Sequence, residues 1–275
     1  MKRLKRYIKR LINILKRPEV RILPGQIAYF VVLSAVPLIA LIGCLCSLFS
    51  VSLNGVLNIF VENIPEAVIN ILKPAFTNPG FTAGFSIIVG FIVASNGTHS
   101  IIVATNLLFK IETKDYIKRR IKAFFMLIVL VLLFFFIVVV LGFGNVILKM
   151  ILSLKVLANV SEYIYTIFIL LKWPIAIVLI FFMVTLLYTM ALDKRIPSRY
   201  MNKGAVFTTC CWLLVTAVYS YYASNFANYS LFYGNLANLV VLMIWVYILA
   251  YIFVIGIAIN SDNYNVEKNV INKKD

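Results

Sequence analysis

The feature that most constrains this chain is a series of long apolar runs separated by short loops rich in Lys and Arg. One run, from Leu127 to Leu141, contains no polar side chain. Of the 275 residues, 63% are hydrophobic and 13% are charged, which leaves too few polar groups to cover a surface that faces water. Apolar area that the protein cannot bury must be buried in lipid. We therefore expect an all-α membrane protein, because helices satisfy their own backbone hydrogen bonds within a bilayer.

Six of the apolar runs are long enough to cross a membrane as helices. Residues 1–22 are expected to form a basic amphipathic helix on the membrane surface, and residues 261–275 a polar, disordered cytosolic tail. Residues 23–260 then form one transmembrane domain, with one or two interfacial helices on the outer side. The expected spans are residues 25–49, 81–108, 121–148, 173–192, 204–226 and 235–260.

Prolines mark several expected features of these spans. Pro24 would lie in the first turn of the first span, where a helix tolerates proline. Pro37 lies within that span and predicts a kink, because proline has no backbone N–H to donate, and Ser34 is placed to rebond the strained turn. The segment Lys172-Trp173-Pro174 is typical of a membrane boundary, with a snorkelling lysine, an interfacial tryptophan and a proline that starts a helix.

The basic residues predict the orientation of the chain. With the N-terminus inside, 22 of the 26 Lys and Arg residues fall in cytosolic segments and 4 in outer segments. This asymmetry predicts a multi-pass protein of the bacterial cytoplasmic membrane with both termini in the cytosol. The basic residues behind the net charge of +16 lie at the ends of apolar runs. This position favours a role in orienting the protein and contacting anionic lipids over nucleic-acid binding.

The N-terminal segment places apolar side chains on one helix face and basic side chains around the rest. We expect this helix to lie on an anionic membrane surface. A signal peptide is the alternative, but the following apolar run is too long and lacks a small-residue cleavage site. The side chains expected to contact anionic headgroups are Lys2, Arg3, Lys5, Arg6, Lys9 and Arg10.

The second span differs from the others because it is polar on every side in its later half. Ser86, Gly90, Ala94 and Thr98 are each four apart and predict a face that another helix approaches closely. His99 has two interpretations, a buried histidine that hydrogen bonds to its neighbours, or a ligand or proton contact in a wet cavity.

Polar and aromatic side chains of several spans predict a crevice that opens outward between the second, fifth and sixth helices. Hydrogen bonding between helices is the alternative explanation for many of them. The candidate crevice residues are Ser34, Pro37, Ser95, Asn96, Thr98, His99, Asn106, Tyr219, Tyr233, Gly234, Asn235, Trp245 and Asn260.

The sequence predicts no catalytic residue, metal site or cofactor. Metal-dependent hydrolysis of RNA needs several His and Asp ligands, or a pair of His residues, and this chain has one histidine. Its ten carboxylates all lie in loops or tails on both sides of the membrane. Cys44, Cys46, Cys210 and Cys211 lie inside apolar runs without metal or redox spacing and are expected to be small buried hydrophobes.

Four segments form a recognisable pattern, in order, over about residues 20 to 262. They are Gln26 to Pro37; Ser95-Asn-Gly-Thr-His-Ser with Thr105-Asn106; Arg195-Ile-Pro197 with Gly204-Ala205 and Trp212; and Tyr233-Gly234-Asn-Leu with Trp245-Val-Tyr247 and Gly256-Ile-Ala-Ile-Asn260. Together they resemble the YihY/BrkB family of membrane proteins. Two positions depart from the family pattern: Ala258 stands where Glu is usual, and Asn235 replaces a small residue.

The resemblance implies a six-helix inner-membrane protein linked to serum resistance and envelope integrity. A ribonuclease label once given to the family is generally regarded as mistaken. We expect a transporter or flippase-like protein for a lipid or a small polar solute; the alternative is a scaffold for envelope assembly that transports nothing. Expected partners are membrane lipids, with a homo-oligomer or envelope proteins also open, and no nucleic acid.

Overall fold

A computed structural model describes residues 12–48, 81–112, 115–138, 161–226 and 237–271. Within these ranges the chain is helical and contains no strand, as an all-α protein requires. The predicted lipid contacts from Lys2 to Arg10 and the turn from Tyr233 to Asn235 lie outside the described residues. The elements are α2 (Pro18–Leu48), α5 (Phe81–Leu108), α6 (Tyr116–Val138), α8 (Ser161–Ala191), η3 (Ser198–Tyr200), α9 (Asn202–Phe226) and α11 (Ala237–Ile271).

The turn between α5 and α6 is fixed by a helix-ending hydrogen-bond pattern. Lys110 has a positive φ of 54°, so the chain leaves α5 through a left-handed residue. Its backbone N–H donates to the carbonyl of Leu107, and the N–H of Ile111 donates to the carbonyl of Asn106. These two bonds form a Schellman motif, which satisfies carbonyls that the last helical turn would leave unpaired.

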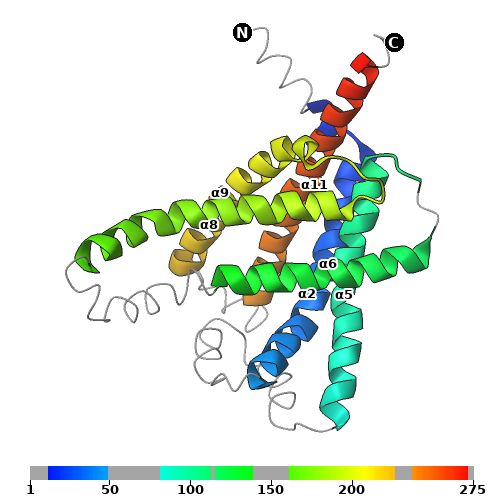
Figure 1. Ribbon diagram of the computed structural model, residues 1–275. Coiled ribbons are helices and arrows are strands. Elements are labelled where there is room, and N and C mark those ends of the chain that lie inside the picture. The colour runs from blue at the N-terminus through cyan, green and yellow to red at the C-terminus, as the bar shows by residue number, and fades with distance from the viewer. Residues whose placement is uncertain (1–11, 49–80, 113–114, 139–160, 227–236, 272–275) are drawn as a thin grey trace.

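One end of each long helix lies at the same end of the molecule (Figure 1). Arg17, just before α2, forms an ion pair with Asp262 of α11 at 3.2 Å. The hydroxyl of Ser261 donates to the carbonyl of Leu108, which joins α11 to the end of α5. We call this region, where α2, α6 and α9 begin and α5 and α8 end, the common end.

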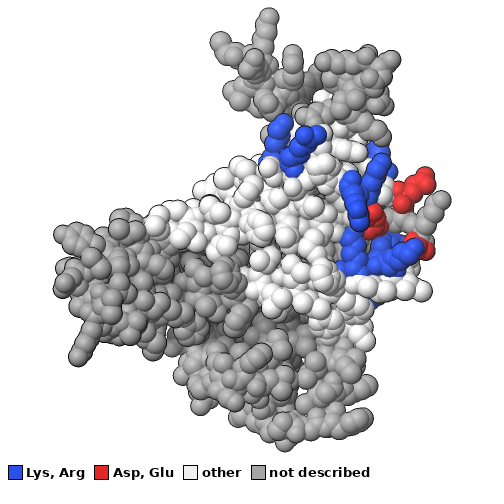
Figure 2. Space-filling model, in the orientation of Figure 1, with Lys and Arg blue, Asp and Glu red and all other residues white. Residues whose placement is uncertain are grey.

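The common end carries most of the basic residues in the described part of the chain. Figure 2 shows Lys and Arg side chains gathered around it, with uncharged residues over the rest of that described face. These side chains come from the segments where α2, α6 and α9 begin and from the loops between α5 and α6 and between α8 and α9. Basic residues that are separated by apolar runs in the sequence thus lie close together at one end of the structure.

The buried core lies near the common end, and the helices diverge from it (Figure 1). Val20, Ile102, Met126 and Val254, from α2, α5, α6 and α11, are each fully buried in one core cluster. Apolar side chains farther along α9 are exposed, including Leu214 at 68%. Such exposed apolar helix faces are typical of a surface that contacts lipid rather than water.

Four described helices contain segments that are long and apolar enough to cross a membrane. They are Gly90–Leu108, Pro174–Ala191, Asn202–Tyr222 and Val240–Val266. The chain is therefore a membrane protein with several apolar helices. The predicted total of six spans stays a prediction, since α2 and α6 do not reach this standard over their described residues.

Two predictions about helix ends were wrong. Pro174 lies inside α8, not at its start, because the apolar stretch before it continues the helix and proline is tolerated within apolar membrane helices. The expected disordered tail from Ser261 is helical to Ile271. Contacts of Ser261 with Leu108 and of Asp262 with Arg17 stabilise this extension of α11.

The start of the first helix also differs from the expected one. α2 begins at Pro18, so Pro24 lies in its second turn. Pro18 has the role that was expected of Pro24, because proline suits the first position of a helix, where its missing N–H costs no hydrogen bond.

Candidate functional site

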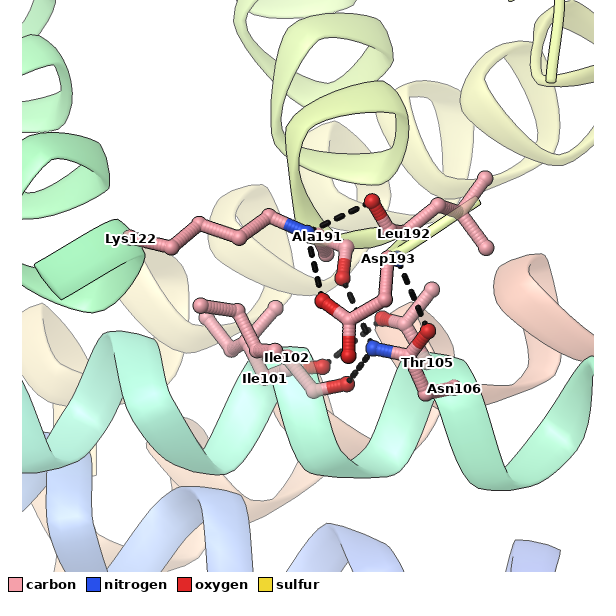
Figure 3. A network of polar contacts seen from close by, with 8 residues as sticks. All are labelled: Ile101, Ile102, Thr105, Asn106, Lys122, Ala191, Leu192 and Asp193. Carbon is pink, nitrogen blue, oxygen red and sulfur yellow. Dashed lines mark hydrogen bonds and ion pairs between the residues drawn. The ribbon is translucent and has the colours of Figure 1, made fainter. Parts of the chain in front are cut away.

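Asn106 is the centre of a buried polar network where α5, α6 and α8 meet (Figure 3). Its amide nitrogen donates to the carbonyl of Ile102 at 2.8 Å and to the carbonyl of Ala191 at 3.0 Å. Its amide oxygen accepts the backbone N–H of Asp193 at 2.9 Å. Ala191 ends α8, so Asn106 satisfies backbone groups that the end of this helix leaves unpaired.

Lys122 of α6 contacts the same end of α8 (Figure 3). Its ammonium group donates to the carbonyl of Leu192 at 2.5 Å and pairs with a carboxylate oxygen of Asp193 at 2.8 Å. The two charged side chains are 26% and 22% exposed, so water screens the pair only partly. A cation at the carboxyl end of a helix is also favoured by the helix dipole.

Two glycines let α9 and α11 approach until their backbones touch. A Cβ atom on Gly204 would overlap the carbonyl oxygen of Gly256, and one on Gly256 would overlap the hydroxyls of Thr208 and Tyr188. The Tyr188 hydroxyl, from α8, donates to the carbonyl of Phe253 at 2.9 Å and lies 2.7 Å from the Thr208 hydroxyl. Small residues at such crossings are the usual means of close helix packing in membranes.

Asn260 lies one turn after Gly256 at the same crossing and is fully buried. Its amide oxygen accepts the backbone N–H of Gly204 at 2.7 Å, which satisfies a donor in the first turn of α9. Its amide nitrogen has no partner within the described part of the chain. Ala258, two residues earlier, is also fully buried.

The α5–α6 contact holds four of the candidate residues. Thr98 donates to the carbonyl of Ala123 at 2.8 Å, and Ala94 packs beside it on the expected small-residue face. Ser95 bonds to its own helix through the carbonyl of Ile92. The remaining two, Asn96 and His99, contact basic and aromatic side chains near the start of α6.

Asn96 and His99 lie close to the start of α6. Arg120 donates to the amide oxygen of Asn96 at 2.7 Å. The ring of His99 meets the ring of Tyr116 edge-on, with centroids 5.7 Å apart. The Nε2 atom of His99 is buried and has no hydrogen-bond partner among the described residues.

The other described candidates lie at two more helix contacts. Ser34 of α2 donates to its own helix at Phe30 and lies 3.3 Å from the carbonyl of Val93 on α5. Tyr219 of α9 stacks on Trp245 of α11, with ring centroids 5.0 Å apart.

The candidate residues are thus distributed over several helix contacts. Asn96 and His99 lie together, as do Tyr219 and Trp245, whereas Ser34, Asn106 and Asn260 each belong to a different contact. The outward crevice stays a prediction, because the turn from Tyr233 to Asn235 and the side chain of Pro37 lie outside the described residues.

Sequence reasoning missed four residues that complete these contacts. Lys122 and Arg120 were interpreted only as topology signals, and Asp193 only as part of a loop. Tyr188 lies in an apolar run, where a tyrosine can be an interface residue as easily as a buried donor. The available signal was its hydroxyl, since a buried hydroxyl must find an acceptor.

Comparison with known proteins gives a consistent family assignment. Residues 14–274 match the family model described as virulence factor BrkB. The chain is 25% identical over 243 residues to the ribonuclease-like protein YfkH of Bacillus subtilis, covering 86% of this chain and 87% of that protein. It is 27% identical over 267 residues to a UPF0761 membrane protein of Vibrio parahaemolyticus, covering 93% of this chain and 81% of that protein. No solved structure matches.

Proposed function

The chain belongs to the virulence factor BrkB family, and we propose that it moves a lipid or a small polar solute at the bacterial cytoplasmic membrane. The observation that carries the proposal is the contrast between the two ends of the helices. Polar contacts join them at the common end, and they diverge away from it (Figure 1).

The gathering of basic side chains supports placing the common end in the cytosol. Lys and Arg are retained on the cytosolic side of membrane proteins, and here they surround the common end (Figure 2). The ion pair between Arg17 and Asp262 brings residues near both termini to this end, which supports cytosolic termini. In this orientation the divergent helix ends face the outer leaflet.

The contacts at the common end support a form of the protein that is closed to the cytosol. Asn106, Lys122 and Asp193 join three helices, and Asn260 joins α9 to α11. A substrate would then reach the protein from the outer side or from the bilayer. Alternating access would require these contacts to open, so the two ends exchange roles.

The side chains on the divergent parts of the helices favour a substrate without strong charge. The expected spans contain no carboxylate, which argues against a relay of Asp or Glu. Hydroxyl, amide and aromatic groups, such as the stacked Tyr219 and Trp245, suit a neutral polar solute or the headgroup of a lipid. Trp245 also carries a buried Nε1 donor with no partner in the described part of the chain.

A scaffold that transports nothing is the second candidate. Ser34, Thr98, Asn106, Tyr188 and Ser261 are buried and each hydrogen bonds within the protein, as a static helix bundle requires. We propose no nuclease activity for this chain, on the ground that its sequence has one histidine and no carboxylate within an expected span.

Reconstitution into vesicles tests the proposal. Purified protein is incorporated into liposomes that contain fluorescent phospholipids or enclose labelled polyols, and movement across the bilayer is timed. We expect wild type to exceed protein-free vesicles, and Trp245→Ala to lower the rate by about fivefold or more through loss of a substrate contact.

The matched control is Leu214→Ala, which shortens an exposed apolar side chain on α9 and should leave the rate unchanged. A wild-type rate equal to that of empty vesicles for both substrate classes would reject the transport proposal and favour the scaffold.

A further inference from the structure

The start of α6 concentrates positive charge where a helix ordinarily disfavours it. Lys118, Arg119 and Arg120 follow its first residues, and no acid lies in the first turn. The helix dipole is positive at this end, so each cation here costs free energy unless an anion pairs with it. Asp115 pairs only with Lys118, at 2.6 Å, and this hydrogen bond raises the pKa of the lysine.

The two arginines have no carboxylate partner among the described residues. Arg120 donates to the amide oxygen of Asn96 and to the carbonyl of Ile92, and its guanidinium lies 5.3 Å from the centroid of the Phe124 ring. All three partners are uncharged. The Nε atom of Arg119 is buried and has no hydrogen-bond partner in the described part of the chain.

His99 faces this pair from α5. Asn96 and His99 are three residues apart on one face of α5, and Tyr116, Arg119 and Arg120 share one face of α6. His99 contacts Tyr116 edge-on, and the charges of both arginines act on it. The neighbouring helices α5 and α6 thus each carry a buried nitrogen, Nε2 of His99 and Nε of Arg119, that has no partner among the described residues.

We propose that Arg119, Arg120 and His99 form a binding site for a phosphate group at the α5–α6 contact. Guanidinium groups bind phosphate oxygens through pairs of charge-assisted hydrogen bonds, and the Nε2-protonated form of His99 supplies another donor. The phosphate belongs to the headgroup of an anionic lipid in the adjacent leaflet or to free phosphate in the cytosol. The site rests on the proposed orientation, since it must face the cytosolic side.

The orientation rule alone does not explain this arrangement. Retention of Lys and Arg on the cytosolic side requires charge in loops and helix ends that water can solvate, as it does Lys118 at the start of α6. It does not require buried nitrogens of Arg119 on α6 and of His99 on the neighbouring helix α5 that have no partner among the described residues. A bound anion would satisfy both atoms and offset the unfavourable charge at the start of α6.

Binding to the full chain in neutral detergent tests the site separately from transport. Fluorescent short-chain phosphatidylglycerol is titrated into wild type and into Arg119→Gln and His99→Gln, with phosphatidylcholine as the lipid control and inorganic phosphate as the competitor. Arg119→Gln removes no hydrogen bond seen in the structure, whereas a change of Arg120 would remove its bonds to Asn96 and Ile92, so Arg119 is the arginine chosen for the test. Lys118→Gln is the matched control, because it removes the same charge from an exposed neighbour on the same helix.

We expect Arg119→Gln and His99→Gln each to weaken phosphatidylglycerol binding by about tenfold, and Lys118→Gln to change it by less than about twofold. Competition by inorganic phosphate would support the shared phosphate chemistry, and binding of inorganic phosphate without the lipid would assign the site to free phosphate. Binding of neither probe, or equal loss in Lys118→Gln and Arg119→Gln, would overturn the proposal. A vesicle assay that shows no transport would leave this binding result intact.

Discussion

At the common end, single polar side chains connect the helices, and they do so mainly by hydrogen bonds to backbone groups. Asn106 satisfies the carbonyl of Ala191 and the N–H of Asp193, and Asn260 satisfies the N–H of Gly204. The sequence singled out both asparagines, because an amide within an apolar span must find a partner. It could not identify the partners, since every residue carries a backbone carbonyl and almost every one an N–H.

Replacement of Asn106 tests the network around α8. Asn106→Ala would leave the carbonyl of Ala191 and the N–H of Asp193 without this partner, and we expect a loss of about 1–2 kcal/mol of unfolding free energy. The measurement is unfolding of the purified protein in detergent. Leu107→Ala is the control, because Leu107 is 51% exposed and its loss should matter little. Equal effects of the two changes would contradict the role of the amide.

Gly256→Ala tests the close approach of α9 and α11. The added methyl group would overlap the hydroxyls of Thr208 and Tyr188, so the helices must separate and the hydrogen bond between these side chains must break. We expect a loss of about 1–3 kcal/mol in thermal unfolding experiments, as for other overpacked sites.

Gly25→Ala is the matched control for this change, because nothing lies within 4 Å of its added methyl group. Alanine is the better helix former by about 0.5–1 kcal/mol, so this variant should be as stable as wild type or more stable. A Gly256→Ala protein that unfolds at the wild-type temperature would show that the two backbones do not touch.

At the scale of elements, apolar length predicts where helices lie better than it predicts where they end. The helix α5 begins and ends at the residues expected of the second span, from Phe81 to Leu108. The extension of α11 through polar residues could not be predicted, because contacts distant in sequence, such as Asp262 with Arg17, stabilise it. Pro174 misled the prediction because proline signals a helix start in water but is tolerated within a membrane helix.

A double-mutant cycle tests how α6 is joined to the end of α8. Lys122→Met and Asp193→Asn each remove one partner of the ion pair, and the double variant removes both. We expect a coupling of about 0.5–1 kcal/mol in unfolding free energy, since the pair is partly shielded from water. Additive effects within about 0.3 kcal/mol would mean that the two side chains do not interact.

At the scale of the whole molecule, the difference between the basic common end and the divergent apolar end relates sequence, structure and proposed function. Basic residues that the sequence places at helix ends gather at the common end (Figure 2). The polar contacts of Asn106, Lys122 and Asn260 that join the helices lie there too. The predicted orientation followed from the number of basic residues in each loop. The divergence of the helices did not, because it depends on packing between side chains of different helices.

The most direct test of this asymmetry is the side of the membrane on which the common end lies. Ser198 is exposed in the loop between α8 and α9, so Ser198→Cys in a background with the four native cysteines replaced reports on that end. The measurement is labelling by a maleimide that cannot cross membranes, in intact and permeabilised cells. We predict labelling only after permeabilisation, and equal labelling in intact cells would place the basic end outside and contradict the proposed orientation.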